Sequence, residues 1–203
     1  MLQMTRMAES ILESMPERSV TGHYTGPAII LHWLIAVLIT ANVAIILLSE
    51  SVGETNIRFM YDTHKSIGLT VFGLVVLRYL WRISHRPPAL PENYRSWEKV
   101  ASKWAHGILY FIMFFMPVTG WLHDSAWDGA AQIKLSYFGL FDVPRAGWIM
   151  NMEPVAKDAL HSLMGNAHEI GGYALYALVF LHIGGALKHQ FIDKHRELQR
   201  MWR

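Results

Sequence analysis

The segment from Gly165 to Lys188 constrains the fold most, because a long apolar run in it is bounded by two histidines. Between His168 and His182 only Glu169 is charged. A run this long and this apolar is typical of a helix that crosses a membrane. The spacing of fourteen residues between the two histidines corresponds to about 21 Å along a helix, with both imidazoles within about 40° of one face. One helix therefore offers a nitrogen ligand near each side of the bilayer.

Three further apolar segments indicate a small polytopic membrane protein. The chain has 203 residues, of which 52% are hydrophobic and 17% are charged, and this apolar content is high for a soluble domain. We predict an all-α membrane protein, a four-transmembrane-helix bundle over residues 28–190. The expected spans cover about 28–48, 61–82, 101–122 and 162–188.

The distribution of Lys and Arg predicts the orientation of the bundle. Basic residues gather between spans two and three and after span four, whereas acidic residues are mixed into the other two links. By the positive-inside rule, the N-terminal segment (1–27) and the tail (191–203) are cytoplasmic in a bacterial inner (plasma) membrane. Residues 1–27 are expected to be a frayed tail or an interfacial amphipathic helix.

The long link over about 124–160 is then expected to lie on the outer face. Its aromatic residues are typical of anchors at the membrane interface, although a surface that binds a partner protein is the alternative. These aromatic residues are Trp127, Tyr137, Phe138, Phe141 and Trp148.

The predicted direction of each span gives every histidine a depth, and four depths match in pairs. His32 and His182 fall near the inner face, and His64 and His168 near the outer face. An octahedral haem iron takes one axial nitrogen from each side of the ring, so its ligands come from two facing helices. Zinc would require three or four ligands at one depth. The pattern predicts two haems, with His32 and His182 on the inner iron and His64 and His168 on the outer iron.

The chain contains no cysteine, which excludes covalent c-type haem and cysteine-ligated iron–sulfur clusters. We therefore expect haem that is bound non-covalently. Two other histidines are rivals as ligands. His106 either pairs with an inner histidine or contacts a haem propionate, and His161 is the rival outer ligand because it lies one heptad before His168.

Charged residues and glycines near these histidines suggest further contacts with haem. Arg78 lies fourteen residues after His64, so it is a candidate partner for an inner propionate, with snorkelling to the headgroups as the alternative. Lys65 is a candidate for an outer propionate. Gly68 and Gly172 each follow a predicted ligand by one turn, which leaves room for the macrocycle or permits close helix packing.

His189 lies one heptad past His182, at the inner interface. Two interpretations of this residue stay open. It is either a polar residue that reaches the headgroups or a hydrogen-bond partner for a quinone.

Several motifs resemble the bacterial cytochrome b561 family over roughly residues 24–195. They are Leu31-His32-Trp33-Leu34, Thr63-His64-Lys65-Ser66-Ile67-Gly68, Pro117-Val118-Thr119-Gly120, and His168-Glu169 through His182 to His189. The resemblance implies a four-helix inner-membrane bundle with two b haems that exchanges electrons with ubiquinone. Some members of the family oxidise superoxide at the outer face.

These observations lead to a predicted function and two alternatives. We expect an oxidoreductase that moves electrons between an outer donor, with superoxide as the candidate, and ubiquinone. The first alternative is a cytochrome b subunit that links a partner dehydrogenase or hydrogenase to quinone, and the second is a haem-free transporter with a histidine proton relay. The expected partners are membrane lipid, quinone and a periplasmic electron-donor protein, and no nucleic acid.

Overall fold

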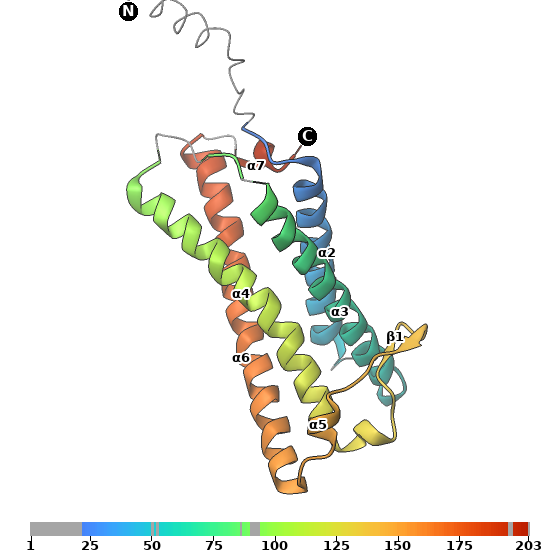
Figure 1. Ribbon diagram of the computed structural model, residues 1–203. Helices are drawn as coiled ribbons and strands as arrows, with labels where there is room; N and C mark the ends of the chain where they lie inside the picture. Colours follow the sequence, from blue (N-terminus) through green and yellow to red (C-terminus); the bar gives the residue numbers. More distant parts are fainter. Residues whose placement is uncertain are drawn as a thin grey trace, which may run out of the picture.

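Four long helices form the molecule (Figure 1). The computed structural model describes residues 22–49, 51, 53–85, 87–89, 94–194 and 197–202. The helices are α2 (Gly26–Ser49), α3 (Glu54–Ser84), α4 (Ser96–Ala126) and α6 (Pro154–Leu187). Each is long and apolar enough to cross a membrane, so the predicted four-helix membrane bundle is confirmed. The prediction for residues 1–21 lies outside the described residues.

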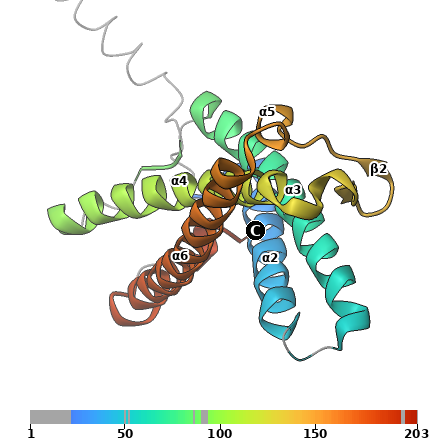
Figure 2. The same ribbon diagram turned by 90° about the horizontal axis from the view of Figure 1, so that it is seen from below.

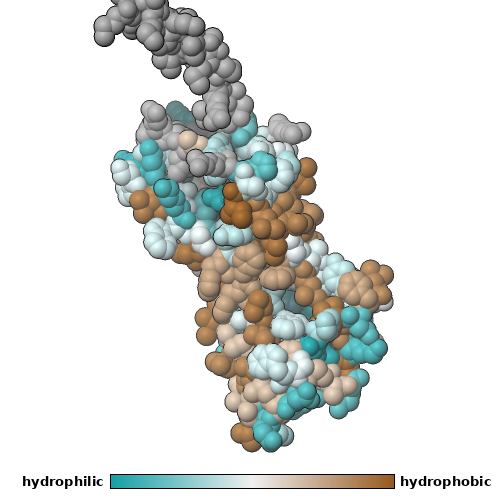
Figure 3. All heavy atoms as spheres, in the orientation of Figure 1, coloured by the Kyte–Doolittle hydropathy of each residue, from teal (hydrophilic) through white to brown (hydrophobic). Residues whose placement is uncertain are grey.

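The surface of the bundle supports the same conclusion. Many large apolar side chains are exposed, and the well-buried apolar cluster is small, with Ile35, Ile67, Val71 and Val75 at its centre. On the face that Figure 3 shows, apolar residues cover the middle of the molecule and polar residues gather toward its two ends. An apolar surface of this kind is stable only where lipid, not water, surrounds the helices.

Helices α3 and α6 extend beyond the predicted spans at the end of the bundle that is predicted to be outer. Helix α3 begins at Glu54 and not near residue 61, and α6 begins at Pro154 and not near residue 162. Pro154 suits the first helical turn, because its missing N–H would have no partner there. The apolar pattern marks where lipid contacts a helix, whereas backbone hydrogen bonding continues past that point. The third link therefore covers only 127–153, shorter than the expected 124–160.

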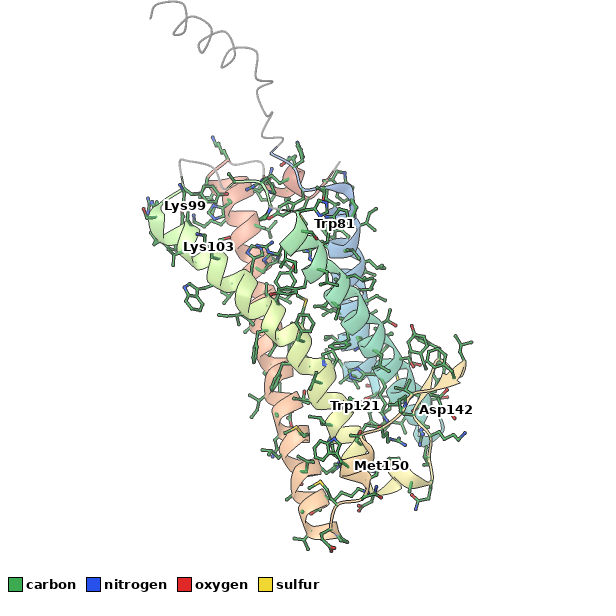
Figure 4. The ribbon with its side chains drawn as sticks, viewed as in Figure 1. Trp81, Lys99, Lys103, Trp121, Asp142 and Met150 are labelled. Atoms are coloured by element: carbon green, nitrogen blue, oxygen red, sulfur yellow. The ribbon has the colours of Figure 1, made fainter. Side chains whose placement is uncertain are left out.

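This link is folded and covers the outer end of the bundle. It contains η1 (Asp128–Ala131), β1 (Ser136–Tyr137), β2 (Phe141–Asp142) and α5 (Gly147–Met150). Ile149 of α5 is fully buried in a cluster with Ala126 and Ala146. Figure 4 labels Trp121 of α4 and Met150 of α5 at this end, and Trp121 Nε1 donates a hydrogen bond to the Pro144 carbonyl over 3.0 Å.

A buried carboxylate fixes the link to two helices. Asp124 of α4 accepts hydrogen bonds from Lys65 Nζ of α3 at 2.6 Å and from Arg145 Nε of the link at 2.7 Å. Arg145 Nη1 also donates to the carbonyls of Ala130 and Ile133 over 2.6 and 2.5 Å. Because Asp124 and Arg145 are both buried, the loss of either one would leave a buried charge without its main partner.

The other end of the bundle carries both the start of α2 and the C-terminal helix (Figure 1). A π-helical turn, η2 (Lys188–Ile192), follows α6 and leads toward α7 (Glu197–Arg200). Arg200 is buried. Its Nε donates to the Gly22 carbonyl over 3.1 Å, and its Nη2 donates to the carbonyls of Pro88 and Ala89 over 3.1 and 2.9 Å. Arg200 therefore attaches the predicted tail to this end, although most of the described tail residues are exposed.

Candidate haem-binding sites

The predicted outer pair of histidines meets across two helices. His64 of α3 and His168 of α6 have ring centroids 6.1 Å apart and ring planes at 82°. A bond between a metal and an imidazole nitrogen is about 2 Å long, and the ring centroid lies about 1 Å behind that nitrogen. Two imidazoles on opposite sides of one metal would therefore have centroids about 6 Å apart. The observed spacing suits one axially ligated iron between the rings.

Backbone carbonyls orient both rings of the outer pair. His168 Nδ1 lies 3.0 Å from the Met116 carbonyl oxygen and 3.2 Å from Thr119 Oγ1. His64 Nδ1 lies 3.4 Å from the Asn42 carbonyl oxygen. Because a carbonyl only accepts, Nδ1 carries the proton in each ring and Nε2 keeps a lone pair. Metal-binding histidines are commonly held in this way.

Glycines border the outer pair on several sides. A Cβ atom on Gly172 would have its nearest neighbours at 3.9 and 4.0 Å, and one on Gly68 would lie 3.9 Å from Asn42 Nδ2. Both positions thus have space beside a predicted ligand. Gly120 is tighter, because a Cβ there would lie 3.1 Å from His168 Cε1. We did not single out Gly120 from spacing, although it belongs to the Pro117–Gly120 motif.

Lys65 is not free to act as the sole cation for an outer propionate. Its ammonium is hydrogen-bonded to Asp124 at 2.6 Å. The side-chain oxygen of Asn42 is also buried here, without a hydrogen-bond partner among the described residues. A group bound near the outer pair would therefore meet a buried hydrogen-bond acceptor, the Asn42 side-chain oxygen, among mostly apolar side chains.

The inner level brings three imidazoles together. His32 of α2 lies 6.1 Å from His182 of α6 between ring centroids, with ring planes at 72°. His106 of α4 lies 5.5 Å from His182, and its Nδ1 is 2.6 Å from the Ser102 carbonyl oxygen. The spacing of His32 and His182 equals that of the outer pair. His106 lies close enough to His182 to remain a rival ligand or a neighbour of the haem edge.

Arg78 also lies at the inner level. Its Nη1 donates to the carbonyl oxygen of Ala28 over 2.5 Å, one turn before His32. A guanidinium has five N–H donors, so this bond leaves capacity for a carboxylate. The structure thus places Arg78 near the inner pair, and its contact with a propionate remains a prediction.

A cleft of about 610 Å³ between α3 and α4 has His106 in its wall, but neither His32 nor His182. Aromatic rings form much of its wall, and two cations, Arg82 and Lys103, lie beside them. Lys103 is labelled on α4 in Figure 4. The full lining is Tyr79, Arg82, Lys103, His106, Gly107, Tyr110, Phe111 and Phe114. Apolar walls with a few cations suit a flat macrocycle that carries carboxylates.

His161, the rival outer ligand, pairs with a different histidine. Its ring stacks on His123 of α4 with centroids 3.9 Å apart. Each Nδ1 lies near the other residue's carbonyl oxygen, at 3.0 Å for His161 and 2.9 Å for His123. This pair lies about 10 Å farther out along α6 than His168. In the structure His161 therefore joins α6 to α4 through His123, and His168, not His161, faces His64.

His189 belongs to a polar cluster at the inner end. Its Nδ1 lies 2.7 Å from Asp193 Oδ2, and its ring stacks on Tyr94 with centroids 4.5 Å apart. Lys188 Nζ bridges Asp193 at 2.6 Å and Glu98 at 3.0 Å. The hydrogen bond from Lys188, and then that from His189, holds the pKa of Asp193 below its usual value.

The ligand atoms of His189, Glu98 and Asp193 lie within 4.8 Å of one another, close enough to hold a metal ion. The Lys188 ammonium, however, already binds both carboxylates. We predicted only His189 from the sequence. Its spacing of four residues from Asp193 could have revealed the pair, whereas Glu98 is distant in the sequence.

Comparison with known proteins identifies the family. Residues 23–203 match the family model described as prokaryotic cytochrome b561. The chain belongs to the prokaryotic cytochrome b561 family. It is therefore a bacterial membrane b-type cytochrome that binds haem b and transfers electrons, and the resemblance seen in the sequence is confirmed.

Two curated proteins of Escherichia coli K12 are similar over most of the chain. Cytochrome b561 homolog 2 is 31% identical over 172 residues, which cover 84% of this chain and 86% of that protein. Cytochrome b561 homolog 1 is 25% identical over 184 residues, covering 89% of this chain and 97% of the homolog. The similarity to these cytochrome b561 homologs thus extends over the whole bundle.

Proposed function

We propose that this cytochrome holds two haem b groups and moves electrons from a donor at the outer face to ubiquinone at the inner face. In this proposal both termini are cytoplasmic. The main support is the geometry of the histidines, since two pairs of opposed rings have the same 6.1 Å centroid spacing. The pairs are separated by fourteen residues along α6, or about 21 Å. When bound, haem supplies one-electron redox chemistry.

The chain's own residues would hold and isolate the two groups. His32 and His182 would provide the inner ligands, and His64 and His168 the outer ones. Two protein ligands leave the iron no open coordination position, so the site would transfer electrons and not bind oxygen. Arg78, Arg82 and Lys103 would place positive charge toward inner propionates. An arginine at the centre of a span costs about 2.5–3.5 kcal/mol on insertion scales, which a carboxylate partner offsets.

His189 would bind the quinone carbonyl at the inner end. Its Nδ1 lies 2.7 Å from Asp193, and the imidazole would contribute a hydrogen bond to a quinone oxygen. Reduction of one quinone to a quinol consumes two electrons and two protons, and oxidation of two superoxide ions to two oxygen molecules releases two electrons. Asp193 would position the His189 ring, and the hydrogen bonds of Lys188 to Asp193 and Glu98 connect that ring to the inner surface.

Superoxide is our candidate for the outer donor, and it rests on the family resemblance. Stopped-flow mixing of the purified cytochrome with superoxide and ubiquinone would test it. We expect quinol to form faster than superoxide dismutates spontaneously. If no such rate is found, superoxide is not the donor. A dehydrogenase or hydrogenase that co-purifies stoichiometrically from native membranes would then favour the role of a cytochrome b subunit.

Haem counting in histidine variants would test the ligand assignment. The wild type is expected to bind two haems per chain, and His64→Ala and His182→Ala one each. His161→Ala is the matched control on α6 and should keep two haems, because that ring stacks on His123. If His32→Ala keeps two haems and His106→Ala loses one, His106 is the inner ligand. If the wild type binds one haem, the two-haem proposal is wrong.

A further inference from the structure

The hairpin β1–β2 carries an apolar tip that points away from the bundle. Tyr137 pairs with Phe141 in this antiparallel hairpin, and the chain turns through Phe138, Gly139 and Leu140. Phe138, Leu140 and Phe141 have exposed fractions of 49%, 75% and 58%. Figure 2 shows the hairpin extending sideways beyond α3, and Figure 3 shows an apolar protrusion at the same place. No residue from 137 to 141 is charged.

Hydrogen bonds from α3 hold this hairpin in place. Ser66 of α3 is buried, and its Oγ accepts a hydrogen bond from the Phe138 backbone N–H over 3.0 Å. Thr70 Oγ1 lies 2.9 Å from the Tyr137 hydroxyl. Phe138 and Gly139 have φ values of 48° and 73°, and a positive φ is unfavourable for a bulky residue such as Phe. The bond to Ser66 thus stabilises a tight turn that directs the tip outward.

The attachment lies within the depth of the bilayer. Ser66 and Thr70 belong to the candidate membrane span Asn56–Ser84, and Ser66 lies within one turn of His64. The two histidine levels are about 21 Å apart, whereas the hydrocarbon layer is about 30 Å thick. If the two levels are centred, the outer one lies about 4–5 Å inside the hydrocarbon boundary. Ser66 is two residues farther along α3, about 3 Å nearer the bilayer centre, so the tip is level with acyl chains about 7–8 Å below that boundary.

The base of the hairpin is polar, which fits the same position. Lys134 and Asp142 form an ion pair of 2.6 Å, and both side chains are exposed. An apolar aromatic tip next to a charged base is typical of segments that lie in the membrane interface. The hairpin also extends sideways beyond α3 (Figure 2), a candidate membrane span that lipid would surround. We therefore propose that Phe138, Leu140 and Phe141 insert among phospholipids of the outer leaflet and anchor the third link to the membrane.

The chain has no cysteine, so one spin label on an introduced cysteine can test this anchor. We would label Leu140→Cys in the haem-loaded protein, reconstituted in vesicles of phosphatidylethanolamine and phosphatidylglycerol. Collisions with oxygen, which concentrates in lipid, and with a water-soluble nickel chelate report the label's surroundings. The matched controls are Val37→Cys, exposed within the span of α2, and Lys134→Cys, at the base of the hairpin.

We expect the Leu140→Cys label to resemble that of Val37→Cys, with collisions with oxygen at least several times more effective than those with the nickel chelate. A label at Phe141→Cys should give the same result, which guards against a local effect of one variant. A nickel response as strong as that of Lys134→Cys would show that the tip lies in water. A label shielded from both reagents would show a protein contact, such as a second copy of the chain. Either result would overturn the proposal.

Discussion

Replacing Gly120 with alanine should weaken the outer haem site without unfolding the bundle. The new Cβ would lie 3.1 Å from His168 Cε1 and 3.3 Å from its Nδ1, so the ring must give way by a few tenths of an ångström. The same ring is held by the Met116 carbonyl oxygen at 3.0 Å and by Thr119 Oγ1 at 3.2 Å. The shift therefore displaces a ligand that its neighbours hold in one orientation.

The expected loss follows from what holds His168 in place. A weakened hydrogen bond costs about 0.5–1.5 kcal/mol, and loss of a group that orients a metal ligand typically lowers affinity by about 10–100-fold. We expect outer haem affinity to fall about tenfold, or about 1.4 kcal/mol. The helix itself should not suffer, because alanine is favoured over glycine inside a helix by about 0.8–1.0 kcal/mol.

Haem titration of the apoprotein, followed by reduced-minus-oxidised spectra and redox potentiometry, would measure the effect. Gly73→Ala in α3 is the matched control, because it makes the same substitution inside a span and a Cβ there meets nothing within 4 Å. The control should bind both haems like the wild type. If Gly120→Ala also keeps wild-type affinity and potential at the outer site, the ring orientation set by the Met116 carbonyl and Thr119 is not what lets His168 hold that haem.

Three further changes test other parts of the structure. Asp193→Asn should slow quinone reduction on the order of tenfold and leave haem reduction by dithionite unchanged. This is less than the 10²–10⁴-fold that a general acid or base typically contributes to a rate, because Asp193 acts through His189. Because the pKa of Asp193 is held below its usual value, its carboxylate stays charged until the pH falls through that lowered pKa. The infrared carboxylate band that the variant lacks should then persist from pH 5 to pH 8 in the wild type, and its loss within that range would contradict this. Arg145→Met should destabilise the protein by about 3–5 kcal/mol, measured by thermal unfolding in detergent. A double variant that also carries Asp124→Asn should recover part of this loss. An unchanged melting temperature would show that the ion pair does not support the fold. Ser66→Ala should free the hairpin at a cost of about 1–3 kcal/mol and speed its proteolysis. The control Thr40→Ala, whose hydroxyl bonds the Ala36 carbonyl of its own helix, should not.

The pairing of histidines could be predicted because it depends on only two quantities. Helix rise gives the distance between His168 and His182, and the direction of each span gives the depth of His32 and His64. Both are readable from the apolar pattern and the basic loops. The competition between His32 and His106 could not be settled in this way, because depth does not specify how a helix is rotated about its axis. Rotation is set by packing, which brings both rings close to His182.

The ends of the helices and the fold of the third link were less predictable. Apolar windows follow lipid contact, so they missed the outer turns of α3 and α6 where polar residues continue the helix. Arg145 and Arg200 bind backbone carbonyls of distant segments, and any residue can supply a carbonyl. No pattern of side chains in the sequence therefore marks those contacts.

The carbonyl contacts of Arg200 also have a consequence for biosynthesis. This residue leaves the ribosome after every hydrophobic helix, yet it binds Gly22, Pro88 and Ala89. The segment before α2 and the loop after α3 can therefore form these hydrogen bonds only after Arg200 has been synthesised, near the end of translation. Closure of this end of the bundle therefore follows the synthesis of all four long helices.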